Sequence, residues 1–411
     1  MTTVPRAGPW TPRVTVALAV LAAAAFIYVT AEIMPVGALS AIARDLHVSE
    51  AMVGTLLASY ALVAAVATMP LVRWTATWPR RRTLLWTLAC LSVSQLISAL
   101  APTFEVLAVG RVLCAVTHGL MWSVIAPIGA RLVPPSYAGR ATMAVYVGTG
   151  LALVVGSPLT AAMSELWGWR PAVGAITVAS LVVLVAARLA LPVMAMAGAG
   201  AGIRPRRGGH HRNRPLLVLC ALTLVGVTAH FISYTFIVVI IRDVVGVRGA
   251  HQAWLLAAYG VAGLTGMALL ARPGDRRPKA AVVGCLAGSS LAFAALATLG
   301  WADWTEWRPA AASVVGAAAI VLWGATANAM PPMLQAAAMR HSPEDPDGAS
   351  GLYVAMFQVG IMAGSLTGGV LYQHAGVAPM LVASAVLMLG ALVCVLFSRG
   401  LFAVAPATSE K

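Results

Sequence analysis

Apolar runs of about 20 residues follow one another along the whole chain, and short polar segments separate them. A run of this length, wound as an α-helix, is long enough to cross the roughly 30 Å hydrocarbon core of a membrane. The pattern therefore predicts twelve membrane-spanning helices. Their approximate bounds are 14–38, 51–72, 83–101, 106–130, 141–164, 171–191, 215–241, 250–271, 280–300, 309–331, 350–373 and 378–398.

The composition agrees with an all-α membrane protein. Of the 411 residues, 60% are hydrophobic and 10% are charged, whereas soluble domains carry roughly a quarter of charged residues. The first apolar run is longer than the core of a signal peptide, and no small-residue cleavage site follows it. We therefore expect this run to be retained as a helix.

The basic residues are distributed unevenly between the two ends of the predicted helices. If the N-terminus is cytoplasmic, the cytoplasmic segments and adjoining helix ends hold 21 Lys and Arg residues, and the opposite segments hold 5. Because positive loops remain inside, both termini are predicted to be cytoplasmic. The net charge of +14 then reflects loops that meet anionic lipid headgroups, and no nucleic-acid partner is expected.

The second half of the chain repeats a pattern of the first half. The segment IARDLHVSEAMVGTLLASYALV begins at Ile42, and IRDVVGVRGAHQAWLLAAYGVA begins at Ile241. Within them, LLASY (56–60) matches LLAAY (255–259). Twelve spans thus form two halves of six in parallel orientation. The predicted bounds are 1–191 for the first half, 192–214 for a Gly-rich basic linker, 215–400 for the second half and 401–411 for a tail.

Glu32 is the one acid of the 13 that lies inside an apolar run, and Arg111 is the one arginine or lysine that lies inside a run and away from its cytoplasmic end. An ionised carboxylate in a span costs about 2.5–3.5 kcal/mol, so such residues usually face water or a partner. Both lie at similar depth from the outer side. Two interpretations remain open: Glu32 carries a proton during transport with Arg111 as its switch, or the two form a static buried ion pair.

Helical spacing places further polar and aromatic side chains near Glu32 and at mid-span. Residues four or seven apart share a helix face, and transporters bind substrates near the membrane midplane. The candidates for a substrate cavity are Tyr28, His118, Trp122, His230, Tyr234, Asn328, Gln335 and Gln358. The alternative for each histidine is a core residue bonded to a carbonyl, and the amides also serve to join helices.

Five segments together resemble one family. They are AEIMPVGALSAIARDL (31–46), GRVLCAVTHGLMWSVIAPIGARLVPPSYAGRA (110–141), VGTGLALVVGSPLTAAMSELWGWR (147–170), HFISYTFIVVIIRDVVGV (230–247) and MRHSPEDPDGASGLYVAMFQVGIMAGSLTGGVLY (339–372). The chain is similar to the 12-helix drug:proton antiporters of the major facilitator superfamily, in the branch of arabinose-, chloramphenicol- and purine-efflux-type exporters. The resemblance implies a motif specific to exporters at Gly148, Gly150, Gly156 and Pro158.

The resemblance also implies a cytoplasmic gate loop after the second and eighth helices. Its candidates are Arg80, Arg81, Arg82 and Asp275. The family pattern has an acid in the first of these loops, where this chain has Ala76. The gate contact of that acid is therefore in doubt.

We expect a proton-coupled antiporter of the bacterial inner membrane that exports a small organic compound by alternating access. The partners are its substrate, protons and the lipid bilayer, and we expect a monomer without cofactor or metal. The chain carries no phosphate loop or nucleophile elbow, so we expect no enzyme. The alternatives are a proton-coupled importer or facilitator of sugars or nucleosides, and a membrane sensor or scaffold that transports nothing.

Overall fold

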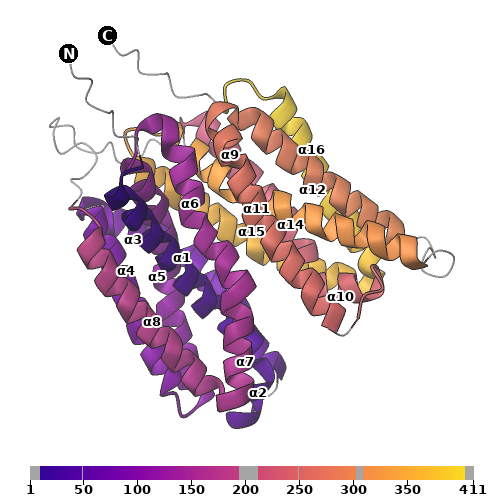
Figure 1. Cartoon of the computed structure of the whole chain (residues 1–411), viewed down its shortest axis with the longest axis horizontal. Helices are drawn as coiled ribbons and strands as arrows, with labels where there is room; N and C mark the ends of the chain where they lie inside the picture. The colour runs from indigo at the N-terminus through magenta and orange to yellow at the C-terminus, as the bar shows by residue number, and fades with distance from the viewer. Residues whose placement is uncertain (1–9, 49, 194–211, 249, 302–308, 403–411) are drawn as a thin grey trace.

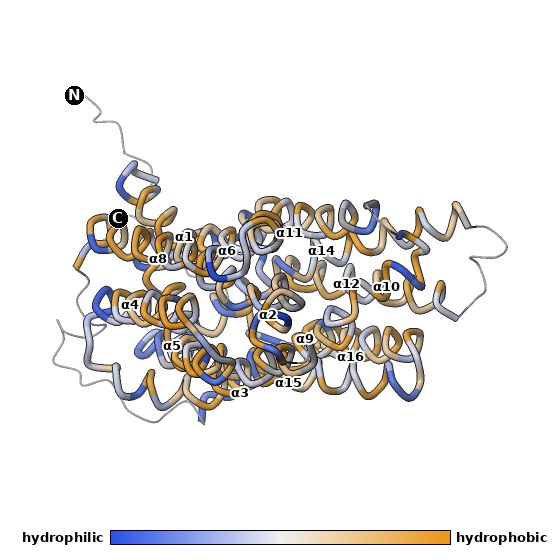
Figure 2. Tube along the Cα trace, turned by 90° about the horizontal axis from the view of Figure 1, so that it is seen from below, coloured by the Kyte–Doolittle hydropathy of each residue, from blue (hydrophilic) through white to orange (hydrophobic). Residues whose placement is uncertain are grey.

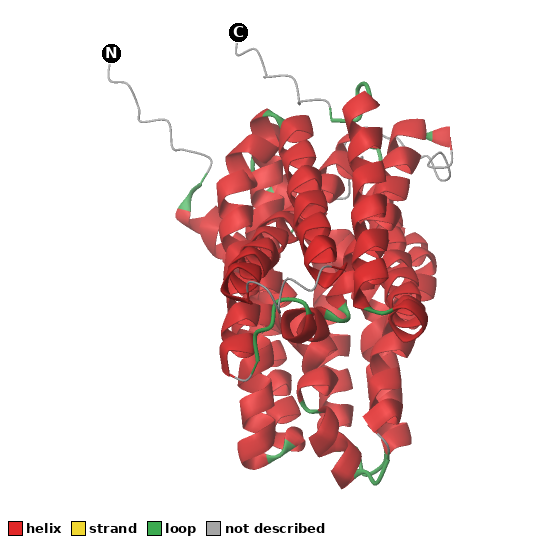
Figure 3. Cartoon of the chain, turned by 90° about the vertical axis from the view of Figure 1, so that its right-hand side faces the viewer, coloured by secondary structure: helices red, strands yellow, loops and turns green. Residues whose placement is uncertain are grey.

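The computed structural model describes residues 10–48, 50–193, 212–248, 250–301 and 309–402. Helices make up the fold in these ranges, and no strand occurs in them (Figure 3). The first group is α1 (Pro12–Gly37), α2 (Leu39–Asp45), α3 (Glu50–Trp74), α4 (Arg80–Ala99), α5 (Phe104–Arg131), α6 (Ala138–Leu151), α7 (Ser157–Trp167) and α8 (Trp169–Ala190). The second group is α9 (Arg214–Tyr234), α10 (Ile237–Asp243), α11 (Ala250–Arg276), α12 (Pro278–Trp301), α14 (Pro309–Arg340), α15 (Pro346–Ala375) and α16 (Val377–Phe397).

Helices occupy all twelve predicted spans, which confirms the fold class. Ten helical segments of the described chain are long and apolar enough to cross a membrane. The other two predicted spans correspond to α3 and α4, with 25 and 20 residues. α4 begins with three arginines and buries the polar residues Ser92, Ser94, Gln95 and Ser98, which reduces its hydropathy.

The helices form two bundles (Figure 1). α1 to α8 make one, and α9 to α16 make the other. The bundles approach each other near the end where α1 begins and α16 ends, called here the terminus end. They diverge toward the end that carries α2, α7 and α10, called here the far end. Contacts of α6 with α11 and of α15 with α3 and α5 join the two bundles.

The halves break their first helices at equivalent points. α1 ends at Gly37 and the short α2 follows, and 198 residues later α9 and the short α10 repeat this arrangement. In α1 the bend follows Pro35, which cannot donate a helical hydrogen bond. Each half therefore begins with a long helix followed by a short one, whereas the sequence predicted one continuous span in each place.

The fifth span contains a π-helix. α6 runs into a π-helical segment, Ala152–Gly156, which α7 continues. Pro158 follows in α7 and cannot donate a helical hydrogen bond to the preceding turn. Such π-segments are rare and are frequently found at functional sites.

The outer surface of the molecule is apolar. Large hydrophobic side chains such as Val182, Leu189 and Phe397 are exposed at 62%, 81% and 83%. Figure 2 shows that hydrophobic residues run along the helices and that hydrophilic ones gather toward helix ends. Because lipid tails solvate apolar side chains, this distribution fits a protein that spans a membrane.

Candidate functional site

Arg111 of α5 reaches the bend in α1. Its Nη1 atom donates to the carbonyl of Ala31 at 2.5 Å, and its Nη2 atom donates to the carbonyl of Glu32 at 2.7 Å. Pro35 lacks an N–H, so the Ala31 carbonyl four residues earlier has no helical donor. Arg111 therefore satisfies a backbone group that the proline leaves free, as backbone inside a membrane requires.

The carboxylate of Glu32 is not paired with Arg111 in this conformation, because the guanidinium binds the carbonyls of Ala31 and Glu32 instead. Its Oε2 atom lies 4.0 Å from Nε2 of His118, and 16% of the Glu32 side chain is exposed. The direct ion pair that one interpretation of the sequence requires is thus not formed here. A carboxyl group without a fixed counter-ion is free to change its protonation state.

Tyr60 of α3 connects His118 and Arg111. Its hydroxyl lies 2.9 Å from Nδ1 of His118, and the Arg111 guanidinium lies 4.8 Å from the centroid of its ring. Tyr60 is not among the residues predicted from the sequence, although it belongs to the repeated LLASY segment. The imidazole of His118 is consequently held on its Nδ1 side and presents Nε2 to Glu32.

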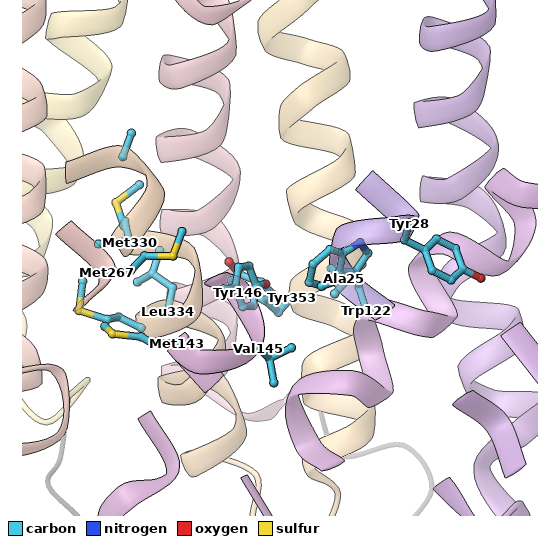
Figure 4. Packing of buried hydrophobic residues seen from close by; sticks show 14 of the residues in the cluster. Ala25, Tyr28, Trp122, Met143, Val145, Tyr146, Met267, Met330, Leu334 and Tyr353 are labelled. Atoms are coloured by element: carbon cyan, nitrogen blue, oxygen red, sulfur yellow. The ribbon is translucent and has the colours of Figure 1, made fainter. Parts of the chain in front are cut away.

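Two further candidates of the first half flank His118 on different sides. The ring of Trp122 lies 6.2 Å from the His118 ring and 5.1 Å from the ring of Tyr146. Tyr28 is completely buried, and its hydroxyl donates to the carbonyl of Thr87 on α4 at 2.7 Å. Figure 4 shows that the Tyr28 hydroxyl points away from Trp122. Tyr28 therefore supports the site from behind and does not face the second half.

The second half has an aromatic cluster at the corresponding level. Trp323 of α14 donates from its indole nitrogen to Nδ1 of His230 at 3.0 Å. The ring of Tyr234 stacks on His230 with a centroid distance of 5.0 Å and an interplanar angle of 20°. The centroid of the Tyr259 ring lies 5.5 Å from the centroid of the Trp323 ring. An indole is only a donor, so the neutral His230 carries its proton on Nε2 and can offer it to a ligand.

The polar centres of the two halves occupy equivalent positions. His230 lies 198 residues after Glu32, and the residues before them are Thr-Ala in both cases. Tyr259 lies 199 residues after Tyr60, in the repeated segment. Trp323 lies 205 residues after His118, and a glycine follows each. In each half, residues of the first and second helices contact a residue of the fourth helix, but the chemical groups differ between the halves.

Ion pairs join the two halves at the terminus end. Asp347 at the start of α15 binds Nε of Arg80 at 2.5 Å and Nη2 of Arg131 at 3.0 Å. Asp275 at the end of α11 binds Nε of Arg140 at 2.6 Å, and it accepts from the Arg140 backbone N–H at 3.2 Å. In these pairs the first half supplies the bases and the second half supplies the acids.

Methionine side chains and the amide of Gln335 form a layer next to the ion pairs. Figure 4 shows Met143 of α6 beside Met267 and Met330 of the second half. Gln335 of α14 is fully buried, accepts from the hydroxyl of Tyr146 at 2.9 Å and donates to the carbonyl of Trp122 at 3.2 Å. Gln335 therefore holds the halves together at the closed end in this conformation.

The glycines of the exporter motif make close helix contacts. A methyl group at Gly148 would overlap the backbone carbonyl of Ala22, and one at Gly156 would overlap Thr30, both in α1. A methyl group at Gly150 would overlap the side chain of Leu264 in α11. Gly150 is thus the motif glycine that lies between the halves here, whereas Gly148 and Gly156 pack within the first half.

The remaining candidates have different surroundings. Gln358 is buried, and its amide nitrogen has no hydrogen-bond partner in the described part of the chain. Asn328 donates to the carbonyl of Gly324 in its own helix at 3.0 Å. Arg81 and Arg82 lie on the outer side of α4, in a groove with α8.

Comparisons with known proteins identify the class. The model of the Major Facilitator Superfamily matches residues 21–344 and 219–410. The chain is 63% identical over 394 residues to the "Chloramphenicol efflux pump Rv0191" of Mycobacterium tuberculosis strain H37Rv, covering 96% of this chain and 94% of the relative. It is 62% identical over the same length to the "Chloramphenicol efflux pump MT0201" of strain CDC 1551, with the same coverage.

Solved structures agree in fold. The human organic anion transporter MFSD10 superposes with a TM-score of 0.75 at 14% identity, covering 94% of this chain and all of that one. The E. coli fucose:proton symporter superposes with a TM-score of 0.70 at 15% identity, covering 93% and 98%. The chain belongs to the Major Facilitator Superfamily, and its curated relatives place it in the drug-efflux branch. It is an efflux transporter for a small organic compound.

Proposed function

We propose that this chain exports chloramphenicol or a similar aromatic antibiotic in exchange for protons across the bacterial cell membrane. The names of its relatives support the substrate class. The observation that carries the coupling is the Glu32 carboxyl group, which lies 4.0 Å from His118 and has no fixed counter-ion. The proposal takes the terminus end as cytoplasmic, as the 21 basic residues of those segments suggest, and a monomer as the working unit.

In this proposal the described conformation faces outward. The terminus end is closed by Asp347 and Asp275 and their arginine partners, and the bundles diverge toward the far end (Figure 1). Rocking of the halves opens the terminus end and closes the far end around a central site. Proton binding at Glu32 from outside precedes the return to the inward state, where the compound displaces the proton.

The substrate contacts come from both halves. His230 and Tyr234 offer an imidazole N–H and an aromatic face, and both are half-buried. The unpartnered amide nitrogen of Gln358 is a further donor. Trp122 and His118 supply the wall on the side of the first half. A compound with an aromatic ring and several hydroxyl or amide groups matches these donors and rings.

Transport in inverted vesicles tests the function. Vesicles with an acidic interior should accumulate radiolabelled chloramphenicol, and a protonophore should abolish the accumulation. An importer or facilitator would instead accumulate the compound in right-side-out vesicles with acid outside, or equilibrate it without a proton gradient. A sensor or scaffold would show no flux above vesicles that lack the protein.

Thiol labelling tests the orientation. In a background without the five native cysteines, Gly208→Cys in the linker should react with a membrane-impermeant maleimide only in inverted vesicles. Thr103→Cys, in the exposed α4–α5 connection at the far end, should react in intact cells. The opposite labelling would reverse the orientation of the whole molecule and the direction of export.

A further inference from the structure

A groove of about 620 Å³ runs along the outer seam of α4 and α8 at the terminus end. It lies on the outside of the first bundle (Figure 1), so it is separate from the region between the halves. Its lining divides into two parts. Arg81, Arg82 and Arg188 gather at the terminus end, and apolar residues such as Leu85, Trp86 and Leu184 continue the groove along the helices.

Contacts with groups other than acids hold the side chains of Arg81 and Arg82. Arg81 donates from Nη2 to the carbonyl of Arg188, which lies in the last turn of α8, where carbonyls have no helical donor. The Nε atom of Arg81 is buried and has no hydrogen-bond partner among the residues that the structure describes. Arg82 lies with its guanidinium 4.7 Å from the centroid of the Trp78 ring. Among the ion pairs of the described residues, none involves these arginines.

Aromatic side chains lie beside the groove at the terminus end of α3 and α4. The rings of Trp74 and Trp78 lie 5.2 Å apart, and those of Trp78 and Trp86 lie 6.2 Å apart. Trp86 is 53% exposed. Tryptophan is enriched at the interface between membrane and water because its ring is apolar and its N–H is polar.

We propose that this groove binds one anionic phospholipid, such as phosphatidylglycerol. The phosphate lies against Arg81 and Arg188, and an acyl chain lies along Leu85, Trp86 and Leu184. Basic pockets at the cytoplasmic side of helices are suited to anionic headgroups. The apolar part of the groove favours a lipid over a free anion, because an inorganic phosphate would leave it exposed. This inference does not depend on the transported compound.

Native mass spectrometry of the full chain tests the proposal. The protein is equilibrated in detergent with equal amounts of phosphatidylglycerol and phosphatidylcholine, and the bound fraction of each is measured. We expect preferential retention of one phosphatidylglycerol. Retention should weaken about fivefold for Arg188→Gln, and about a hundredfold when Arg81→Gln and Arg82→Gln are added.

Two controls distinguish lipid binding in the groove from a general attraction between the lipid and the positive charges of the protein. The triple change Arg272→Gln, Arg276→Gln and Arg277→Gln removes three exposed charges at the same end of the second half, and it should leave retention unchanged. Ala89→Trp fills the apolar part of the groove and should weaken retention of the two-chain lipid while all three arginines remain. Size-exclusion chromatography verifies that each variant is folded.

Three results would overturn the inference. Equal loss in both triple variants would show a diffuse electrostatic effect. Displacement of the lipid by inorganic phosphate at about 10 mM would show a free-anion site. Retention that does not distinguish the two lipids, or that survives loss of Arg81, Arg82 and Arg188, would show that the groove holds no anionic lipid.

Discussion

The two halves place different chemistry at equivalent positions. The first half has Glu32, Tyr60 and His118, and the second has His230, Tyr259 and Trp323. In the first half an acid lies 4.0 Å from an imidazole. In the second half an indole donates to the imidazole, and rings pack around it.

The difference suggests a division of tasks within one repeated frame. An acid inside a membrane span is expensive to keep, and its usual explanation is a functional one. An aromatic cluster with one N–H donor costs little in the same place and suits an aromatic ligand. We therefore assign proton coupling to the first half and much of the substrate contact to the second half.

The largest expected effect comes from identical substitutions at the equivalent positions. Glu32→Gln keeps the size and fixes the neutral state, so it should abolish uphill export while permitting downhill exchange. His230→Gln keeps a donor but removes a ring that stacks on Tyr234, so it should raise the KM about tenfold and keep the coupling. The measurement is substrate-induced proton release from detergent-solubilised protein.

For each variant, one result would contradict the prediction. If Glu32→Gln releases the same proton as the wild type, a histidine such as His118 carries it. If His230→Gln abolishes proton release at saturating substrate, the two halves share the coupling and the division of tasks is wrong. Glu32→Asp is the matched control and should retain partial coupling with an altered pH profile.

The second prediction concerns the bend in α1. Arg111→Met leaves the carbonyl of Ala31 without a donor and should cost about 2–4 kcal/mol in the free energy of unfolding, because two charge-assisted hydrogen bonds are lost. Pro35→Ala restores a helical N–H opposite that carbonyl. The cost of Arg111→Met should therefore fall by about 1 kcal/mol in the Pro35→Ala background.

Denaturant unfolding in mixed micelles measures this double-mutant cycle. In α9 the place of Pro35 is taken by Ser233, which has a backbone N–H. Ser233→Ala should cost only about 1 kcal/mol through its hydroxyl contact with Ser384. Additive costs for Arg111→Met and Pro35→Ala would show that the arginine does not act through the proline bend.

The third prediction compares the two acids at the closed end. Asp347 joins two arginines of the first half, whereas Asp275 joins one. Asp347→Asn should therefore release this end more strongly than Asp275→Asn. The measurement is maleimide labelling of Met143→Cys, a position that is 2% exposed between the halves, in a background without native cysteines.

We expect labelling to become about tenfold faster with Asp347→Asn, which corresponds to about 1.4 kcal/mol. Asp275→Asn should give a smaller increase, because an amide oxygen still accepts from the Arg140 backbone. Asp243→Asn is the control, since Asp243 pairs with the adjacent Arg242 at the far end. A faster reaction in that control would show general loosening of the molecule.

The sequence predicted the spans well because one physical quantity decides them. Each helix must cover the hydrocarbon with apolar side chains, and the runs are long enough to be counted directly. The interruptions were harder to predict. The π-helix at Ala152–Gly156 and the short α2 and α10 depend on how a few carbonyls find donors, and hydropathy does not report that.

The sequence predicted several residues of the site, but it did not predict which groups these residues contact. Depth along the chain placed Glu32 and Arg111 together, but it could not distinguish the carboxylate from the backbone carbonyls as the partner. Pro35, four residues after Ala31, was the available signal. Asp347 was missed because it lies in a polar segment, and only the fold brings it to Arg80.

The smallest effect is expected where the repeated Arg-Asp pair differs between the halves. Asp45 accepts from the indole nitrogen of Trp169 at 3.0 Å and from Arg170, and so ties α2 to α8. Partial burial of Asp45 opposes its ionisation, but the hydrogen bonds from Arg170 and Trp169 hold the pKa of Asp45 below its usual range. The ion pair of Asp243 is with the adjacent residue Arg242, and both residues lie in the short helix α10.

A lowered pKa contributes stability that is present above the unfolded pKa of about 4 and is lost as the pH falls through the folded value. Because the Asp45 side chain is 45% exposed, Asp45→Asn should cost less than about 1 kcal/mol at pH 7. The difference in thermal midpoint between wild type and Asp45→Asn should shrink as the pH falls through the lowered pKa of the folded protein, because both side chains are neutral below it. Asp243→Asn should lower the midpoint at pH 7 by less than Asp45→Asn does, because the ion pair of Asp243 with Arg242 lies within one short helix. A larger decrease of the thermal midpoint for Asp243→Asn than for Asp45→Asn would contradict this comparison and would show that the more stabilising ion pair lies in the second half.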